Sequence, residues 1–130
     1  MISRNLVVLD TNVLIEILKN NQQTIKQVEN IKQKLCVSVI SAMELIYGAR
    51  NKVELMKLQR FLELFHIQHI DQSTSKLSLK LVSKYSKSHT LDIPDSLIAA
   101  TCIQHNSELL TYNLKDFKFI PELLLIEPLV

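Results

Sequence analysis

Glycine is almost absent from this chain of 130 residues, which contains one glycine, Gly48, and three prolines. A single glycine cannot build the glycine-rich loop with which P-loop and dinucleotide-binding proteins hold phosphate, so both classes are excluded. So few chain breakers also predict long helices and short connections, in place of a β-sandwich with many turns.

Cysteine is nearly as rare, because Cys36 and Cys102 are the only two and both stand in apolar stretches. Two buried free thiols in a reducing compartment are expected, and no disulfide. His66 and His69 lie in a strand-like segment with no cysteine pair near them, which argues against a zinc site.

Long apolar runs are also missing: no uncharged apolar run reaches the roughly 18 residues that can span a membrane. Residues 1–4 lead into a short apolar run without a small-residue cleavage site, which argues against a signal peptide, so we expect a cytoplasmic protein. With 47% hydrophobic residues, the chain predicts a single domain over residues 1–130. A net charge of +2 is compatible with a nucleic-acid partner but does not indicate one.

Short apolar runs alternate with helical periodicity along the chain. The runs predict buried strands near residues 6–9, 36–40, 67–70, 109–111 and 123–126. Apolar residues at helical spacing predict helices near residues 13–18, 25–35, 55–65, 77–85 and 94–103, with another after the second strand. This alternation predicts an α/β fold, in which helices cover both faces of a mainly parallel sheet of four or five strands.

Four acidic residues stand where such a sheet would place its functional site. Asp10 follows the first strand, Glu44 the second and Asp116 the fourth, and Asp95 begins a helix. In open parallel sheets the site lies at the carboxyl ends of the strands, where the strand order reverses. We therefore expect these four carboxylates to project from the same edge of the sheet.

Each acid also has a purely structural interpretation. Asp10 could cap the helix that follows it, and Ser41 with Glu44 matches a capping box, in which both residues bind free N–H groups of a helix's first turn. Asp95 in a first turn would be favoured by the helix dipole, and Asp116 could serve an Asx-type turn. Taken one at a time, the acids leave both interpretations open.

The joint pattern favours a metal site. Packed together without a counter-charge, the carboxylates would repel one another, and at least one would have its pKa raised. Mg²⁺ and Mn²⁺ prefer oxygen ligands, relieve this repulsion, and can polarise a phosphodiester and activate water. The sequence therefore suggests metal-dependent phosphodiester hydrolysis.

Four segments resemble the motifs of the PIN-domain family, and within it the VapC-type toxins of toxin–antitoxin pairs. In order they are residues 8–15 (VLDTNVLI), 41–49 (SAMELIYGA), 95–101 (DSLIAAT) and 111–117 (TYNLKDF). The likeness extends from about Val7 to Glu127, and the second motif contains Gly48, the one glycine.

The resemblance implies a Rossmann-like three-layer α/β/α domain and a Mg²⁺- or Mn²⁺-dependent endoribonuclease, the toxin of a type II pair. It also implies a homodimer, a cognate antitoxin that binds at or near the active cleft, and RNA as substrate. It assigns catalysis to Asp10, Glu44, Asp95 and Asp116, with Asp10 and Asp95 as metal ligands. The supporting residues that it implies are Thr11, Asn12, Ser41, Thr111 and Asn113.

The chain departs from the family pattern at two positions. Pro94 precedes the third acid, where the family often has Asn, and Asn113 is the first candidate ligand of the fourth motif, in place of Asp. A neutral amide offers only one coordinating oxygen, so the fourth carboxylate must be Asp116, with Asp92 as an outside candidate. This weakens the case for a second tightly held metal but not for the first.

Lysines recur along one face of a predicted helix, at positions 76, 80, 84 and 87. Lys76, Lys80, Lys84 and Lys87 are either an ordinary solvated face or a track for RNA phosphates. Aromatic residues are few, so recognition of RNA by its shape is expected more than stacking on single strands. Two other functions stay open: a catalytically silent PIN-like module that binds RNA or protein, and an enzyme acting on DNA or phosphomonoesters.

Overall fold

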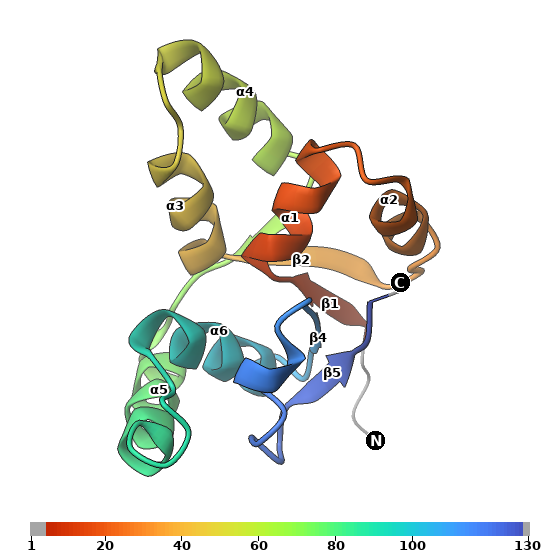
Figure 1. Cartoon of the computed structure of the whole chain (residues 1–130). Coiled ribbons are helices and arrows are strands. Elements are labelled where there is room, and N and C mark those ends of the chain that lie inside the picture. The colour runs from red at the N-terminus through yellow and green to blue at the C-terminus, as the bar shows by residue number, and fades with distance from the viewer. Residues whose placement is uncertain (1–4, 129–130) are drawn as a thin grey trace.

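A five-stranded sheet lies between two layers of helices in the computed structural model, which describes residues 5–128 (Figure 1). In chain order the elements are β1 (Leu6–Leu9), α1 (Thr11–Leu18), α2 (Gln22–Glu29), β2 (Lys34–Ser38), α3 (Val39–Tyr47), α4 (Lys52–Leu62), β3 (His66–Gln68), α5 (Gln72–Tyr85), α6 (Ile93–Gln104), β4 (Glu108–Leu110), the 3₁₀ helix η1 (Leu114–Asp116) and β5 (Leu124–Ile126). All four strand pairings are parallel, in the order β3-β2-β1-β4-β5. The predicted three-layer α/β/α fold with a parallel sheet is confirmed.

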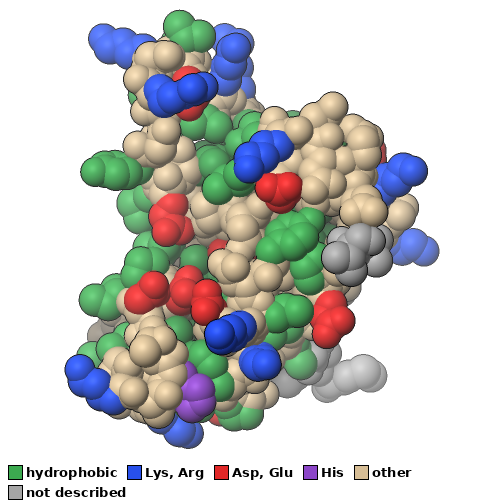
Figure 2. Space-filling model, viewed as in Figure 1, with side chains coloured by type: hydrophobic (Ala, Val, Ile, Leu, Met, Phe, Trp, Pro, Cys, Tyr) green, Lys and Arg blue, Asp and Glu red, His purple; other side chains and the backbone are tan. Residues whose placement is uncertain are grey.

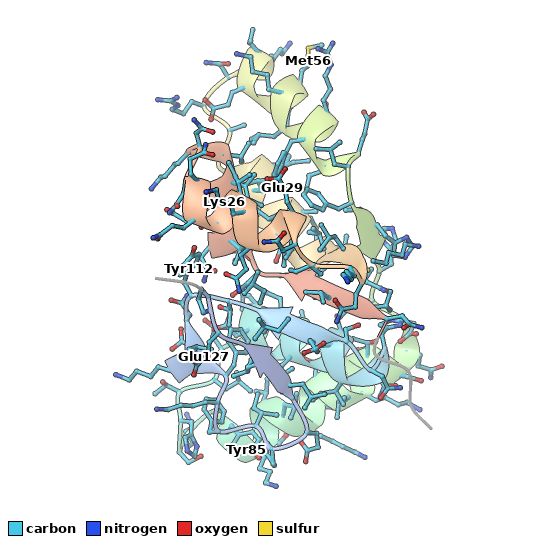
Figure 3. All side chains as sticks on the ribbon, turned by 90° about the vertical axis from the view of Figure 1, so that its right-hand side faces the viewer. Lys26, Glu29, Met56, Tyr85, Tyr112 and Glu127 are labelled. Atoms are coloured by element: carbon cyan, nitrogen blue, oxygen red, sulfur yellow. The ribbon has the colours of Figure 1, made fainter. Side chains whose placement is uncertain are left out.

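β1 shows why both faces of the sheet must be covered. Val7, Val8 and Leu9 are fully buried, and successive side chains of a strand point to opposite faces. Val7 and Leu9 pack into a core with α1, α2, α3 and α4, whereas Val8 packs into a second core with α5 and α6. Figure 3 shows the layers from the side, with Met56 of α4 on one side of the sheet and Tyr85 of α5 on the other. Each such fully buried side chain contributes about 1.5–3 kcal/mol to the stability of this arrangement.

Several predicted element boundaries are wrong, and two of them bear on the position of α3 and β2. The helix expected to reach residue 35 ends at Glu29, and Leu35 belongs to β2 instead. The strand expected to reach residue 40 ends at Ser38, whose hydroxyl accepts the backbone N–H of Ile40 at 3.1 Å and caps α3. Helix α3 therefore begins earlier than the sequence pattern indicated.

This earlier start rules out the capping box proposed for Ser41 and Glu44. Ser38 is the capping residue, so Glu44 lies in the second turn of α3, beyond reach of the helix's free N–H groups. Ser41 is fully buried inside the helix, and its hydroxyl has no hydrogen-bond partner among residues 5–128. The structural interpretation of Glu44 as part of a helix cap is thereby removed.

The strand order reverses between β1 and β4. From β1 the chain proceeds to β2 and β3 on one side, and it returns to β4 and β5 on the other. The backbone N–H of Asp10 donates to the carbonyl of Leu110 at 3.0 Å, which extends the β1–β4 ladder by one residue. Asp10 and Thr111 therefore leave neighbouring strands at the edge where an open parallel sheet places its site.

Three further expectations concern the cysteines, membrane spans and the N-terminus. Cys36 and Cys102 are both buried and free, as predicted. Within the described range, no helix has the length and apolar character needed to cross a membrane. Residues 1–4, on which the argument against a signal peptide rests, lie outside the described residues.

Candidate active site

Asp10 lies at the end of β1 with only 4% of its surface exposed. One carboxylate oxygen, Oδ1, accepts the backbone N–H of Thr11 at 2.8 Å and so caps α1. The other, Oδ2, accepts the hydroxyl of Thr111 at 2.8 Å and lies 3.4 Å from the amide nitrogen of Asn12. The interpretation as a helix cap is therefore correct, but it accounts for only one of the two oxygens.

Thr111 and Asn12 hold the first and fourth motifs together. The fully buried hydroxyl of Thr111 accepts the side-chain amide of Asn12 at 3.3 Å and the backbone N–H of Asn113 at 2.9 Å. The carbonyl oxygen of the Asn12 side chain accepts the backbone N–H of Tyr112 at 3.1 Å. This network fixes the orientation of the Asp10 carboxylate.

Tyr112 ties the same segment to the helical layer. Its hydroxyl and that of Thr24 in α2 are hydrogen-bonded, and Figure 3 shows Tyr112 beside α2. On the same helix, the Gln27 side chain donates to the carbonyl of Glu127 at 3.0 Å. Helix α2 thus holds both the start of the segment after β4 and the residue that follows β5.

Glu44 reaches the site from α3. Its side chain is exposed, and its Oε1 accepts the hydroxyl of Thr11 at 2.9 Å. Because the N–H of Thr11 binds Asp10, one residue links the two acids. The expectation that Glu44 and Asp10 meet at this edge is consistent with these contacts.

Asp95 lies in the first turn of α6, one position after Pro94. Its backbone N–H donates to Oδ1 of Asp92 at 2.8 Å, which makes Asp92 the cap of α6. Burial raises the pKa of Asp95 to about 7, and the nearby carboxylate of Asp92 is the next cause. Three further negative charges raise the same pKa, those of Asp10, Asp116 and Glu44.

Asp116 completes the group at the end of η1, where its side chain is exposed. Burial raises the pKa of Asp10 despite its hydrogen bonds, and the charges of Glu44 and Asp116 raise it further. Two carboxyl groups, Asp10 and Asp95, thus have raised pKa values, with burial as the first cause and the neighbouring carboxylates as a further one.

Acidic side chains gather along a hollow of the surface (Figure 2). On the left of Figure 2, Asp and Glu side chains gather between the arm formed by α3 and α4 and the layer formed by α5 and α6. The ion pairs of residues 5–128 are Lys19–Glu16 and Arg50–Glu54, and neither includes an acid of the site. None of the four site carboxylates therefore forms an ion pair within the described residues.

The donor atoms fit a hard divalent cation. As the side chains lie, no three Asp, Glu, His or Cys residues in the described range converge closely enough to enclose an ion. Such a cage is not required, because Mg²⁺ is usually held by one or two carboxylates and completes its shell with water and substrate phosphate. Carboxylate oxygens are the donors that Mg²⁺ and Mn²⁺ prefer, and Asp10 and Asp95 are the two whose charge is least well solvated.

The sequence pattern of the family described as PIN domain matches residues 7–123. The chain belongs to the PIN-domain family. All four of its resembling motifs fall wholly within the matched range.

Known relatives of this PIN domain are VapC ribonucleases. VapC1 of Methanocaldococcus jannaschii is 32% identical over 117 residues, which are 89% of this chain and 82% of that protein. The tRNA(fMet)-specific endonuclease VapC of Salmonella typhimurium is 28% identical over 119 residues, 87% of this chain and 90% of its own. This PIN domain is thus of the VapC type.

Solved structures of toxin–antitoxin complexes contain chains with the same fold. A toxin–antitoxin complex from Klebsiella pneumoniae contains a chain with a TM-score of 0.80 and 29% identity, covering 95% of this chain and 98% of that one. VapBC2 from Rickettsia felis, bound to a DNA fragment from its promoter, gives a TM-score of 0.82 and 27% identity, covering 94% and 98%. The three-layer fold of the PIN domain is therefore found in assembled toxin–antitoxin pairs.

The predicted lysine stripe forms no ion pair with the acids of the PIN domain within the described residues. Lys76, Lys80 and Lys84 are exposed on α5, and Lys87 follows the end of that helix. Lys84 is the one with a defined contact, because its Nζ lies 5.4 Å from the centroid of the Tyr85 ring. The structure thus places the stripe on the surface without joining it to the carboxylates.

Asp92 is more central than the sequence suggested. It caps α6 and is the charge that raises the pKa of Asp95 most, yet the sequence analysis gave it only an outside role. A signal was present, since an Asp three residues before another acid, with Pro94 between them, is typical of a capped helix start.

Proposed function

We propose that this PIN-domain protein is a metal-dependent endoribonuclease, the toxin of a type II toxin–antitoxin pair. The observation that supports this most strongly is the buried carboxylate of Asp10, held by Thr11 and Thr111 beside Asp95 with no ion pair to neutralise either acid. Such a site is complementary to a divalent cation and, through the cation, to a phosphodiester.

Asp10 and Asp95 would bind Mg²⁺ or Mn²⁺, which, when bound, offsets the charge of the scissile phosphate and lowers the pKa of a coordinated water. Two hydrogen bonds already fix the orientation of the Asp10 carboxylate, so little side-chain conformational entropy is lost when it binds the cation. Glu44 and Asp116 are exposed and their charges act on both Asp10 and Asp95, so either carboxylate could accept a proton from the attacking water. Thr11 keeps Glu44 turned toward Asp10.

An antitoxin and a second copy of the chain are the protein partners that we propose. The structures most relevant to this proposal are toxin–antitoxin complexes from other organisms. The lining of one groove includes Ile15, Leu18, Leu45 and Leu58 together with Thr11 and Glu44. Ile15 and Leu18 are 39% and 44% exposed. An antitoxin segment in this groove would cover apolar surface and reach the acids. The two free thiols suit the reducing cytoplasm that we propose as the compartment.

Side-by-side digestion tests the proposed function. The purified chain is incubated with RNA, with single-stranded DNA and with a generic phosphate monoester, each with Mn²⁺ and with EDTA. We expect cleavage of RNA alone, and only with Mn²⁺, because the acids need a cation to approach a phosphodiester. RNA binding without cleavage would instead identify a catalytically silent module. Digestion of DNA or of the ester would mean that the substrate is not RNA but the molecule digested.

The lysine stripe gives a separate prediction. If Lys76 and Lys80 contact phosphates, replacing both with Gln should weaken the binding of every RNA alike. The log–log slope of affinity against salt should fall by roughly 0.7 per lost contact on a single strand. Turnover at saturating RNA should hardly change, because such contacts bind ground state and transition state equally. An unchanged slope would make the stripe an ordinary solvated face.

A further inference from the structure

A pocket with no acidic residue in its lining borders the carboxylates. Two segments form it, residues 88–90 between α5 and α6 and residues 115–119 around η1. The same segments lead into the acids, because Thr90 stands two residues before Asp92, and Lys115 directly precedes Asp116. Consecutive Cα atoms are about 3.8 Å apart, so the backbone that lines the pocket comes within two residues of Asp92 and one residue of Asp116. Its lining consists of Ser88, His89, Thr90, Lys115, Lys118 and Phe119.

An exposed ring in this pocket is held in a fixed orientation. The imidazole of His89 stacks on Phe119, with ring centroids 4.4 Å apart and planes inclined by 18°. Tyr85 packs against both rings at centroid distances of 5.6 and 5.0 Å, and the hydroxyl of Ser88 lies 2.8 Å from Nδ1 of His89. A flat, exposed ring that needs no further ordering is what stacking of a nucleobase requires.

Positive charge surrounds the same ring. Lys115 and Lys118 are exposed on the pocket wall, and Lys84 lies over the ring of Tyr85. None of the three takes part in an ion pair within residues 5–128. An RNA phosphate that approaches the acids meets a negative field, and lysines beside the acids reduce that field where the strand must pass.

We propose that this pocket is a nucleotide subsite for the RNA strand beside the scissile bond. One base stacks on His89, and the adjoining phosphates contact Lys115 and Lys118. The inference rests on the proposed function and adds a substrate class to it, because only an unpaired nucleotide exposes a face for stacking. It also departs from the expectation that RNA would be recognised by its shape more than by stacking on single strands.

Salt dependence tests the lysines. The Lys115→Gln/Lys118→Gln variant is compared with Lys32→Gln/Lys34→Gln, an equal change of charge at the start of β2, the opposite edge of the sheet. The probe is a short fluorescein-labelled single-stranded RNA of mixed sequence, followed by anisotropy in EDTA at several salt concentrations. We expect the pocket variant to bind more weakly, with a log–log slope lower by about 1.4 for two contacts, and the control to match the wild type.

Two substitutions of His89 test the stacking. His89→Ala should weaken binding of the single strand about 5-fold or more without changing the salt slope, and His89→Phe should restore it by keeping a flat ring. A fully base-paired RNA probe should be much less affected by either change. A merely structural role for His89 would not distinguish the two probes.

The outcomes separate the subsite from the catalytic proposal. If the Lys115→Gln/Lys118→Gln and His89→Ala variants both bind the single strand as the wild type does, the proposed subsite is wrong, whether or not RNA is cleaved. If the wild type binds no RNA, the subsite and the RNA-directed function both fail. If binding changes as expected but RNA is never cleaved with Mn²⁺, the subsite stands and the nuclease proposal fails.

Discussion

Asp10→Asn is expected to lower kcat/KM for RNA cleavage by at least ~100-fold while the protein stays folded. Loss of residues that merely support a metal ligand costs about 10–100-fold, so loss of a direct ligand should reach or exceed the upper value. Asn has the same shape, and its oxygen can still accept the N–H of Thr11 and cap α1. The measurement is initial cleavage rate in Mn²⁺, together with thermal unfolding.

Asp71→Asn is the matched control for this substitution. Asp71 caps α5 by accepting the backbone N–H of Thr74 at 2.8 Å, but it is not among the charges acting on Asp10 or Asp95. This variant should cleave RNA at the wild-type rate. If Asp10→Asn does so too, Asp10 is a helix cap and nothing more.

Asp95→Asn is expected to stabilise the metal-free protein at pH 8 by on the order of 2 kcal/mol. The pKa of Asp95 is raised from 3.8 to about 7, by burial first and then by Asp92. Because this pKa is raised on folding, the Asp95 carboxyl stabilises the folded protein below pH 4, where it is protonated. This contribution to the free energy of unfolding is lost as the pH rises through about 7. A shift of one pKa unit corresponds to about 1.4 kcal/mol. The expected energy is set below the value for the full shift because the Asp95 side chain is partly exposed and screened by water.

Urea unfolding of wild type and Asp95→Asn at pH 4 and pH 8 in EDTA measures this effect. The difference between the proteins should be near zero at pH 4 and appear at pH 8, because only there is the wild-type carboxyl charged. Mn²⁺ at ~100 times its dissociation constant should add about 2.7 kcal/mol to the wild type and less to the variant. Equal stability of both proteins at pH 8 would contradict the raised pKa of Asp95.

The sequence predicted the parallel sheet and the meeting of Asp10 with the segment after β4 because both depend on short-range patterns and one topological rule. The apolar run of β1 can only be buried on both faces, and the edge where the strand order reverses follows from strand–helix alternation. The positions of Asp10 and Thr111 therefore followed from local sequence.

The boundaries of α2 and α3 could not be predicted in the same way. Leu35 continues the helical spacing of residues 25–31, but pairing with β1 places it in β2. Ser38 and Ser41 both fit a helix start, and the choice depends on where β2 stops pairing with β3. Tertiary contacts decide both cases.

The pocket around His89 was not predicted for a different reason. His89 and Phe119 are 30 positions apart in the chain and belong to connecting segments without periodicity. The turn that carries His89 includes Thr90 with a φ of 54°, a left-handed conformation for which the sequence offers no glycine. Only the three-dimensional arrangement of the two segments reveals the stacked rings and the lysines beside them.

Dependence of RNA cleavage on divalent metal tests the central claim most directly. RNA is incubated with the wild-type protein in EDTA, and Mn²⁺ is then added in excess to the same reaction while product is followed over time. We predict no cleavage before the addition and cleavage immediately after it, and no such onset with Asp10→Asn. Cleavage that proceeds unchanged in EDTA, or bound RNA that stays intact after Mn²⁺ is added, would contradict the account.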